Sequence, residues 1–154
     1  VEALLLHHFT HDMAFTAELA ARKLPRWHWA GGVTHAAVLK RLARARLMVV
    51  SSLMEGGANV ICEALAADVP VLASRMSGNV GMLGDDYPGY FPVGDERALA
   101  ALLARTEDDP DFHARLLACG RARRALMRPE QEASRLRQLV AEFEQARAVR
   151  QNRG

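Results

Sequence analysis

The segment from Leu47 to Ser74 carries the pattern that most restricts the fold of this chain. An apolar run, Leu47 to Val50, leads into a glycine-containing loop, and a helical pattern then extends from about Ala58 to Ala67. After Asp68-Val69-Pro70 comes a second apolar run, Val71 to Ala73. Short apolar runs on either side of a helical pattern are typical of buried strands joined by a crossover helix. The segment therefore predicts one strand–helix–strand unit.

The loop of this unit has the features of a phosphate-binding turn. Gly56 and Gly57 allow the backbone to turn sharply and to approach a ligand closely, because they lack a Cβ atom. The helix that starts near Ala58 presents unpaired N–H groups and a partial positive charge, which suits a phosphate or diphosphate. Asn59 and Glu63 are four residues apart and share one helix face. A carboxylate just past a phosphate site is well placed to accept hydrogen bonds from ribose hydroxyls.

A different face of the same helix is expected to pack on the sheet. Ile61 and Leu65 share that face, at the spacing of an amphipathic helix. Taken alone, Glu63 would be interpreted as a surface carboxylate of such a helix. The functional interpretation therefore depends on the wider string of residues.

That wider string resembles a known motif. Glu55, seven residues and Glu63, followed by Ala64-Leu65 and Val69-Pro70-Val71, resembles the donor-binding motif of retaining GT-B glycosyltransferases. More narrowly, the strings MEGGANVICEA, VPVLASRMSGNVGMLG and DDYPGYFPVGD resemble the selenosugar synthase family, the SenB-like proteins of selenoneine biosynthesis. The resemblance covers roughly Trp27 to Leu103.

The resemblance implies both a fold and a reaction. GT-B enzymes have two Rossmann-like domains facing each other across a cleft, and the matched motifs belong to the C-terminal, nucleotide-sugar-binding domain. We therefore expect a fragment that lacks its N-terminal acceptor domain and is inactive alone. The implied reaction moves a sugar from a UDP-sugar, UDP-N-acetylglucosamine, to selenophosphate. A GT-B glycosyltransferase with an ordinary carbohydrate or lipid acceptor and a non-catalytic Rossmann-like binding module are the alternatives.

The resemblance also assigns roles to residues. Glu55 would be the catalytic residue that contacts the donor sugar, and Glu63 would hold the ribose hydroxyls. The nucleotide base would lie near the loop that contains Gly31 and Gly32. The diphosphate would be cradled by the backbone of a run of four residues: Gly56, Gly57, Ala58 and Asn59. No metal or other cofactor is implied, because oriented N–H groups can stabilise the charge on departing UDP.

Three further features of the candidate site stay open in the sequence. Ser77, Gly78 and Asn79 could face the cleft, and an ordinary connection with Ser77 as helix cap is the alternative. Arg75 could approach a phosphate or be solvated. The basic side chains that clamp the diphosphate in the family are not assigned to residues of this chain.

Strand and helix patterns alternate along the rest of the chain. Asp109-Pro110-Asp111 spells D-x-D, the metal–nucleotide motif of the other glycosyltransferase fold, but Asp109 is a good N-cap and Pro110 a good first helical residue. The alternation predicts an α/β fold, a doubly wound parallel sheet with ligands at the carboxyl ends of the strands. We expect residues 1–127 to form this domain and residues 128–154 a C-terminal helix on it. The other expected strands are 1–9, 25–30 and 87–93, and helices are expected to begin after Thr34 and Asp95.

Composition limits the classes of function. The net charge of +2 gives no electrostatic case for nucleic acid as a partner. No apolar stretch approaches the ~20 residues of a membrane span, and no signal peptide is visible, so a cytoplasmic protein is expected. Cys62 and Cys119 are interpreted as buried free thiols. His7, His8 and His11 lack further ligands at zinc-like spacing, so no metal site is expected there.

Overall fold

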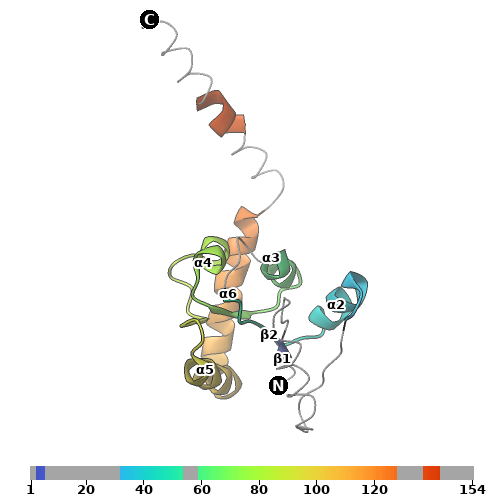
Figure 1. The fold of residues 1–154 in the computed structure, drawn as a ribbon, viewed down its shortest axis with the longest axis vertical. Helices are drawn as coiled ribbons and strands as arrows, with labels where there is room; N and C mark the ends of the chain where they lie inside the picture. The colour runs from blue at the N-terminus through green and yellow to red at the C-terminus, as the bar shows by residue number, and fades with distance from the viewer. Residues whose placement is uncertain (1–2, 6–31, 54–58, 128–136, 143–154) are drawn as a thin grey trace, which may run out of the picture.

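The computed structural model describes residues 3–5, 32–53, 59–127 and 137–142 of this chain of 154 residues. Strands and helices alternate within these residues (Figure 1). The strands are β1 (Ala3–Leu5), β2 (Leu47–Val50), β3 (Val71–Ser74) and β4 (Tyr90–Phe91). The helices are α2 (His35–Leu42), α3 (Asn59–Ala66), α4 (Ser77–Leu83), α5 (Glu96–Asp108) and α6 (Pro110–Leu126). The strand–helix–strand unit predicted between Leu47 and Ser74 is present.

The described strands form one parallel sheet. They lie in the order β1-β2-β3-β4, and Ala3 pairs with Leu47, Val49 with Leu72 and Ser74 with Phe91. This order, in which each new strand is added to the same edge, is that of one half of a doubly wound sheet. The prediction of a parallel α/β fold is confirmed.

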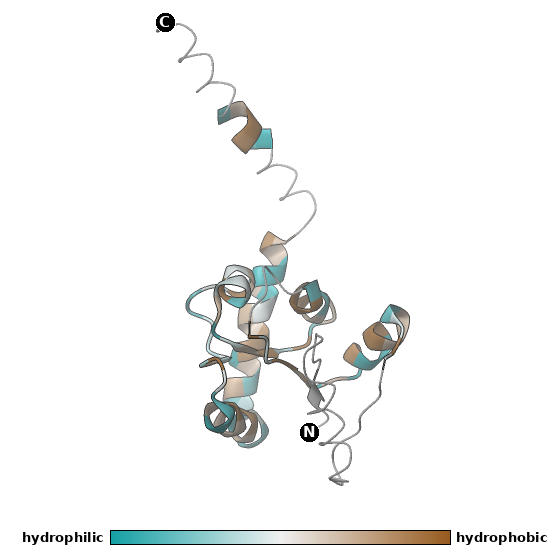
Figure 2. Ribbon diagram, in the orientation of Figure 1, coloured by the Kyte–Doolittle hydropathy of each residue, from teal (hydrophilic) through white to brown (hydrophobic). Residues whose placement is uncertain are grey.

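The core lies around the two central strands. All residues of β2 and β3 are buried, so both faces of the sheet are covered there, as parallel sheets require. Figure 2 shows the same two strands in the hydrophobic colour. Helix α6 contacts α3, α4 and α5 and adds the buried side chains Phe112 and Leu116. In α3, Ile61 and Leu65 are buried as predicted.

Helix starts follow the predicted capping residues at three places. The side chains of Thr34, Asp95 and Asp109 accept hydrogen bonds from the backbone N–H groups of Ala37, Ala98 and Phe112. Pro110 is the first residue of α6, so the D-x-D string is a helix cap, as interpreted from its setting. Each cap satisfies one of the N–H groups that a helix start leaves unpaired.

The start of α4 differs from the sequence expectation. Its N-cap position is Met76, which makes no side-chain capping bond, and Ser77 is already inside the helix. The capping role considered for Ser77 is therefore wrong. The predicted boundary failed because the N-cap residue, Met76, makes no side-chain bond that a local sequence pattern could reveal.

In α2 only Leu42 is buried, and Leu39 is exposed. Two other expectations are settled in part. Cys62 and Cys119 are free thiols, although each is only partly buried. In the helical segment 137–142, Leu139 and Val140 are exposed, and packing of the C-terminal helix on the domain stays a prediction.

Candidate functional site

The carboxyl ends of the strands are the natural place for a ligand in this fold. Because a crossover helix runs back against its strands, α2, α3 and α4 each begin at this edge of the sheet. Two contacts in the structure show that distant segments meet there. The Ser74 hydroxyl donates a 2.6 Å hydrogen bond to the carbonyl of Ser52, and His35 contacts Glu63.

Glu63 lies one turn into α3, on the face that does not pack on the sheet. The buried Ile61 and Leu65 orient the helix, and the Glu63 side chain keeps 26% of its surface exposed. Its Oε1 atom is 2.8 Å from Nε2 of His35, whose side chain is 69% exposed. The carboxylate is thus accessible from solvent and held on one oxygen by the start of α2.

Asn79 forms the buried part of the same edge. Of the two alternatives left open for it, facing the cleft or belonging to an ordinary connection, the structure favours the second, because its side chain is completely buried, at 0% exposure. Its Nδ2 atom donates to the carbonyl of Ser74 at 2.8 Å and to the Ser74 hydroxyl at 3.2 Å. Among the residues that the structure describes, no hydrogen-bond partner faces Asn79 Oδ1. A buried acceptor without a partner is costly, so its presence needs a reason.

Arg75 is held by neighbouring groups. Its guanidinium donates to the Asp85 carbonyl at 3.1 Å, lies 3.6 Å from the Asp85 carboxylate and stacks over the Tyr90 ring at 5.2 Å. Burial raises the pKa of Tyr90 to about 12, so its hydroxyl keeps its proton and lies 2.9 Å from the Gly84 carbonyl oxygen. In this structure the cation is directed to Asp85, and it remains half exposed, as the solvated alternative predicted.

The structure describes only some of the other predicted site residues. Gly32, Asn59 and Ser77 are exposed, and Gly78 is half-buried. The rest of the predicted donor contacts lie outside the described residues: Gly31, Glu55, Gly56, Gly57 and Ala58. The structure therefore brings Glu63 together with His35, while its relation to Glu55 stays a prediction.

Sequence reasoning did not find His35. The signal was available, because Thr34 marks the start of a helix and helix starts gather at the carboxyl edge of such a sheet. The sequence could not show that His35 and Glu63, which are 28 positions apart, lie in contact.

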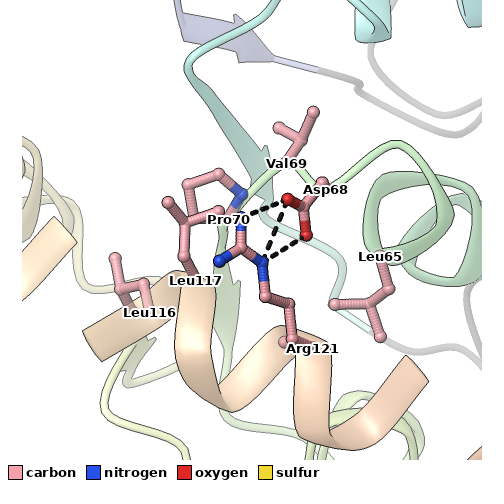
Figure 3. Close-up of a pocket in the computed structure, with 8 residues that line it drawn as sticks. Leu65, Asp68, Val69, Pro70, Leu116, Leu117 and Arg121 are labelled. Atoms are coloured by element: carbon pink, nitrogen blue, oxygen red, sulfur yellow. Dashed lines mark hydrogen bonds and ion pairs between the residues drawn. The ribbon is translucent and has the colours of Figure 1, made fainter. Parts of the chain in front are cut away.

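A crevice at the opposite edge of the sheet is structural. It lies before β3 and is lined by apolar side chains, with Asp68 and Arg121 at its mouth (Figure 3). Asp68 has a left-handed backbone, with φ of 60°, and its carboxylate accepts hydrogen bonds of 2.9 and 3.0 Å from Arg121 Nε. The hydrogen bond from Arg121 holds the pKa of Asp68 below its usual value. The ion pair thus fixes the turn that leads into β3.

The described segments contain neither a group of side chains that could hold a metal ion nor a helix that could span a membrane. There, no three His, Cys, Asp or Glu side chains come together in a group that could hold a metal ion. Of the helices described, none is long and apolar enough to cross a membrane.

Comparison with known proteins defines the class. The chain matches a sucrose-phosphate synthase from Thermosynechococcus elongatus with a TM-score of 0.70 and 26% identity, over 94% of this chain and 38% of that one. The fold is thus the Rossmann-like α/β domain of GT-B glycosyltransferases, and the chain spans well under half the length of that protein. A search of curated proteins finds no match.

The family follows from a second comparison. Residues 15–123 match the family of glycosyl transferases group 1, and the chain belongs to this family. The match includes α2, α3 and α4, whose starts form the carboxyl edge described above.

Proposed function

We propose that this chain is the donor-binding, C-terminal half of a GT-B glycosyltransferase that uses a UDP-sugar. The observation that carries the proposal is the position of Glu63. It stands one turn after the start of α3, on the exposed side of a helix whose other side is anchored by Ile61 and Leu65. Because the chain belongs to a family of glycosyl transferases, we expect this carboxylate to bind a ligand that carries hydroxyl groups.

In this proposal Glu63 accepts hydrogen bonds from both ribose hydroxyls. One carboxylate oxygen already contacts His35, and a carboxylate has about four acceptor positions, so a diol can be accommodated beside that contact. Hydrogen bonds to a charged group are about twice as strong as those between neutral groups. The nucleotide would therefore be anchored through its sugar rather than through its base.

The remaining contacts are proposed from the motif around Glu55. The backbone N–H groups of Gly56 to Asn59 cradle the diphosphate, and Glu55 contacts the donor sugar. Gly31 and Gly32 lie by the base, and Ser77 and Gly78 line the opposite wall. As the bond between the anomeric carbon and UDP breaks, negative charge grows on the diphosphate, and the N–H groups at the start of α3 stabilise it.

The donor and acceptor are proposed from two sequence motifs. The strings MEGGANVICEA and DDYPGYFPVGD support UDP-N-acetylglucosamine as donor and selenophosphate as acceptor, which would give a selenosugar. The acceptor would be bound by an N-terminal domain of the same polypeptide. This chain alone is then expected to bind donor and to turn over little or nothing.

Binding of UDP to the chain tests the donor site. We expect millimolar UDP to raise the melting temperature, and Glu63→Gln to weaken UDP binding at least about tenfold, because a hydrogen bond to a charged group contributes about 1.5–3 kcal/mol. Glu96→Gln, which removes an exposed carboxylate on α5, is the matched control and should bind like the unsubstituted chain. No shift with UDP, or an equal shift in Glu63→Gln, would contradict the proposal.

The acceptor is tested separately on the full-length gene product. With UDP-N-acetylglucosamine and selenophosphate, we expect UDP release and formation of a selenosugar. Release of UDP with carbohydrate acceptors only would overturn the selenium assignment and leave the donor site standing.

A further inference from the structure

Three polar residues link the carboxyl ends of the two central strands through one buried and one partly buried hydrogen bond. Asn79 in α4 donates to the hydroxyl of Ser74, the last residue of β3, and this hydroxyl donates to the carbonyl of Ser52, which follows β2. The donor directions agree, because the single hydroxyl proton of Ser74 is used on Ser52 and its oxygen accepts from Asn79. We call this set the Asn79 relay.

The relay is built into the core. Asn79 and Ser74 are both buried, and Asn79 also donates to the Ser74 carbonyl, so β3 and α4 are fixed to each other at two points. The backbone carbonyl of Asn79 lies 3.2 Å from the Tyr90 hydroxyl, which itself lies 2.9 Å from the Gly84 carbonyl. Asn79 is therefore held at two points, its side chain by Ser74 of β3 and its backbone carbonyl by the hydroxyl of Tyr90.

The relay carries an energetic cost that packing does not explain. Asn79 Oδ1 is buried and has no hydrogen-bond partner among the described residues. An apolar side chain of similar size would avoid that cost, but it would leave the Ser74 carbonyl without the Asn79 donor. A polar side chain at this place is thus explained by the bonds that its Nδ2 atom makes.

The Asn79 relay ends at the carbonyl oxygen of Ser52. Ser52 stands three residues before Glu55 and seven before Asn59, at the point where the chain leaves β2 for the proposed donor contacts. The 2.6 Å bond from Ser74 is one contact by which β3 holds this point. A shift of the Ser52 backbone would displace the proposed donor contacts, which must be positioned to within a fraction of an ångström.

We propose that Asn79 is a positioning residue for the donor site, acting through Ser74 on the backbone at Ser52. The inference rests on the proposed UDP-sugar function, and it adds to that function a residue that does not touch the ligand. Asn79 keeps the backbone at Ser52 in place beside β3, so that loss of the relay loosens donor binding while the sheet stays folded.

The test uses single variants Asn79→Ala and Ser74→Ala, the double variant, and the control Tyr87→Phe. Tyr87 is a fair control, because it also makes buried hydrogen bonds to β3, at the other end of the strand, through the N–H and carbonyl groups of Val71. Amide hydrogen exchange over residues 51–59 is the first readout, and it needs no ligand. UDP affinity is the second.

We expect exchange over residues 51–59 to rise in both single relay variants and to stay unchanged in Tyr87→Phe. UDP affinity should fall about fivefold in each relay variant, the loss expected for one hydrogen bond. The double variant should lose no more than either single one, because both act through the same link. Unchanged exchange over residues 51–59, or an equal rise in Tyr87→Phe, would overturn the proposal whether or not UDP binds.

The two proposals can fail separately. If exchange changes as expected but the unsubstituted chain does not bind UDP, the relay stands and the donor assignment falls. If the unsubstituted chain binds UDP and the relay variants bind it equally well, the positioning role is overturned.

Discussion

Nε2 of His35, at the start of α2, lies 2.8 Å from Oε1 of Glu63 in α3. The contact joins two helix starts at the carboxyl edge of the sheet, where the proposed ribose site lies. Because the pair is largely exposed, its effect on stability should be small, as for most exposed ion pairs. Its effect on the orientation of the Glu63 carboxylate can be larger than its effect on folding.

We expect His35→Ala to weaken UDP binding about two- to fivefold and to leave the urea midpoint unchanged. His35→Gln, which keeps a donor at a similar reach, should restore part of the affinity. Lys40→Ala, an exposed substitution on the same helix, is the control. Tighter UDP binding in His35→Ala would show instead that His35 competes with the ribose.

Gly89 is expected to be intolerant of any side chain. A Cβ atom there would lie 2.6 Å from the carbonyl oxygen of Val71 and 2.7 Å from a ring carbon of Tyr87. Since the nearest atom is backbone of the central strand, Gly89→Ala should lower the free energy of unfolding by about 1–3 kcal/mol, the range for overpacked sites. Urea unfolding measures this loss.

Gly81 provides the matched comparison. It lies inside α4, and a Cβ atom there would meet nothing within 4 Å. Gly81→Ala should raise the free energy of unfolding by about 0.5–1 kcal/mol, because alanine loses less conformational freedom in a helix. Equal effects of the two substitutions would contradict the packing described around Gly89.

The turn before β3 is expected to prefer glycine over alanine at position 68. Asp68 has a φ of 60°, a conformation that costs an ordinary L-residue about 1–2 kcal/mol and costs glycine nothing. Asp68→Gly relieves the backbone but loses the contact with Arg121, whereas Asp68→Ala loses the contact and keeps the strained backbone. Asp68→Ala should therefore be the less stable of the two in urea. The reverse order would contradict the left-handed turn.

Asp95 should stabilise α5 as its N-cap. Its carboxylate accepts a 2.9 Å hydrogen bond from the N–H of Ala98. Asp95→Ala should lower the free energy of unfolding by about 1 kcal/mol, and Asp95→Asn, which keeps an acceptor oxygen, should have little effect. A loss of equal size in both variants would point to charge rather than capping.

Acid should destabilise the domain through two aspartates. The pKa of Asp68 is lowered by its hydrogen bond from Arg121, and that of Asp109 by its hydrogen bond from the Phe112 N–H. A carboxyl whose pKa is lower in the folded state stabilises the fold above its unfolded pKa, about 3.9, and loses this contribution as the pH falls through the folded value. The urea midpoint should thus drop below about pH 4, and less steeply in the variant that carries both Asp68→Asn and Asp109→Asn.

Local patterns predicted the elements of the fold well. The apolar runs predicted β2 and β3, and the capping chemistry of Thr34, Asp95 and Asp109 located three helix starts. These features depend on a few neighbouring residues, so a single sequence contains what is needed to find them. The start of α4 was placed wrongly, because its N-cap residue, Met76, makes no side-chain capping bond that a local pattern could reveal.

The candidate site could be predicted only in part. The position of Glu63 on the exposed side of α3 follows from helical spacing, since Ile61 and Leu65 occupy the buried side. Its contact with His35 does not follow, because 28 positions separate the two residues and only the tertiary fold brings the start of α2 to Glu63. The sequence left open whether Asn79 faces the cleft, and the residue is buried, because its neighbours are set by the sheet.

The amino-acid sequence by itself determined the alternation of strands and helices, their capping residues and the family to which the chain belongs, because each of these depends on short-range periodicity and spacing. The tertiary structure alone decided which polar groups meet at the carboxyl edge. The pairs His35–Glu63 and Ser52–Ser74 join segments 28 and 22 positions apart at this edge, and Asp68–Arg121 joins segments 53 positions apart at the opposite edge. Parallel crossovers bring the ends of distant segments to one edge, and no local pattern records which side chains arrive there together.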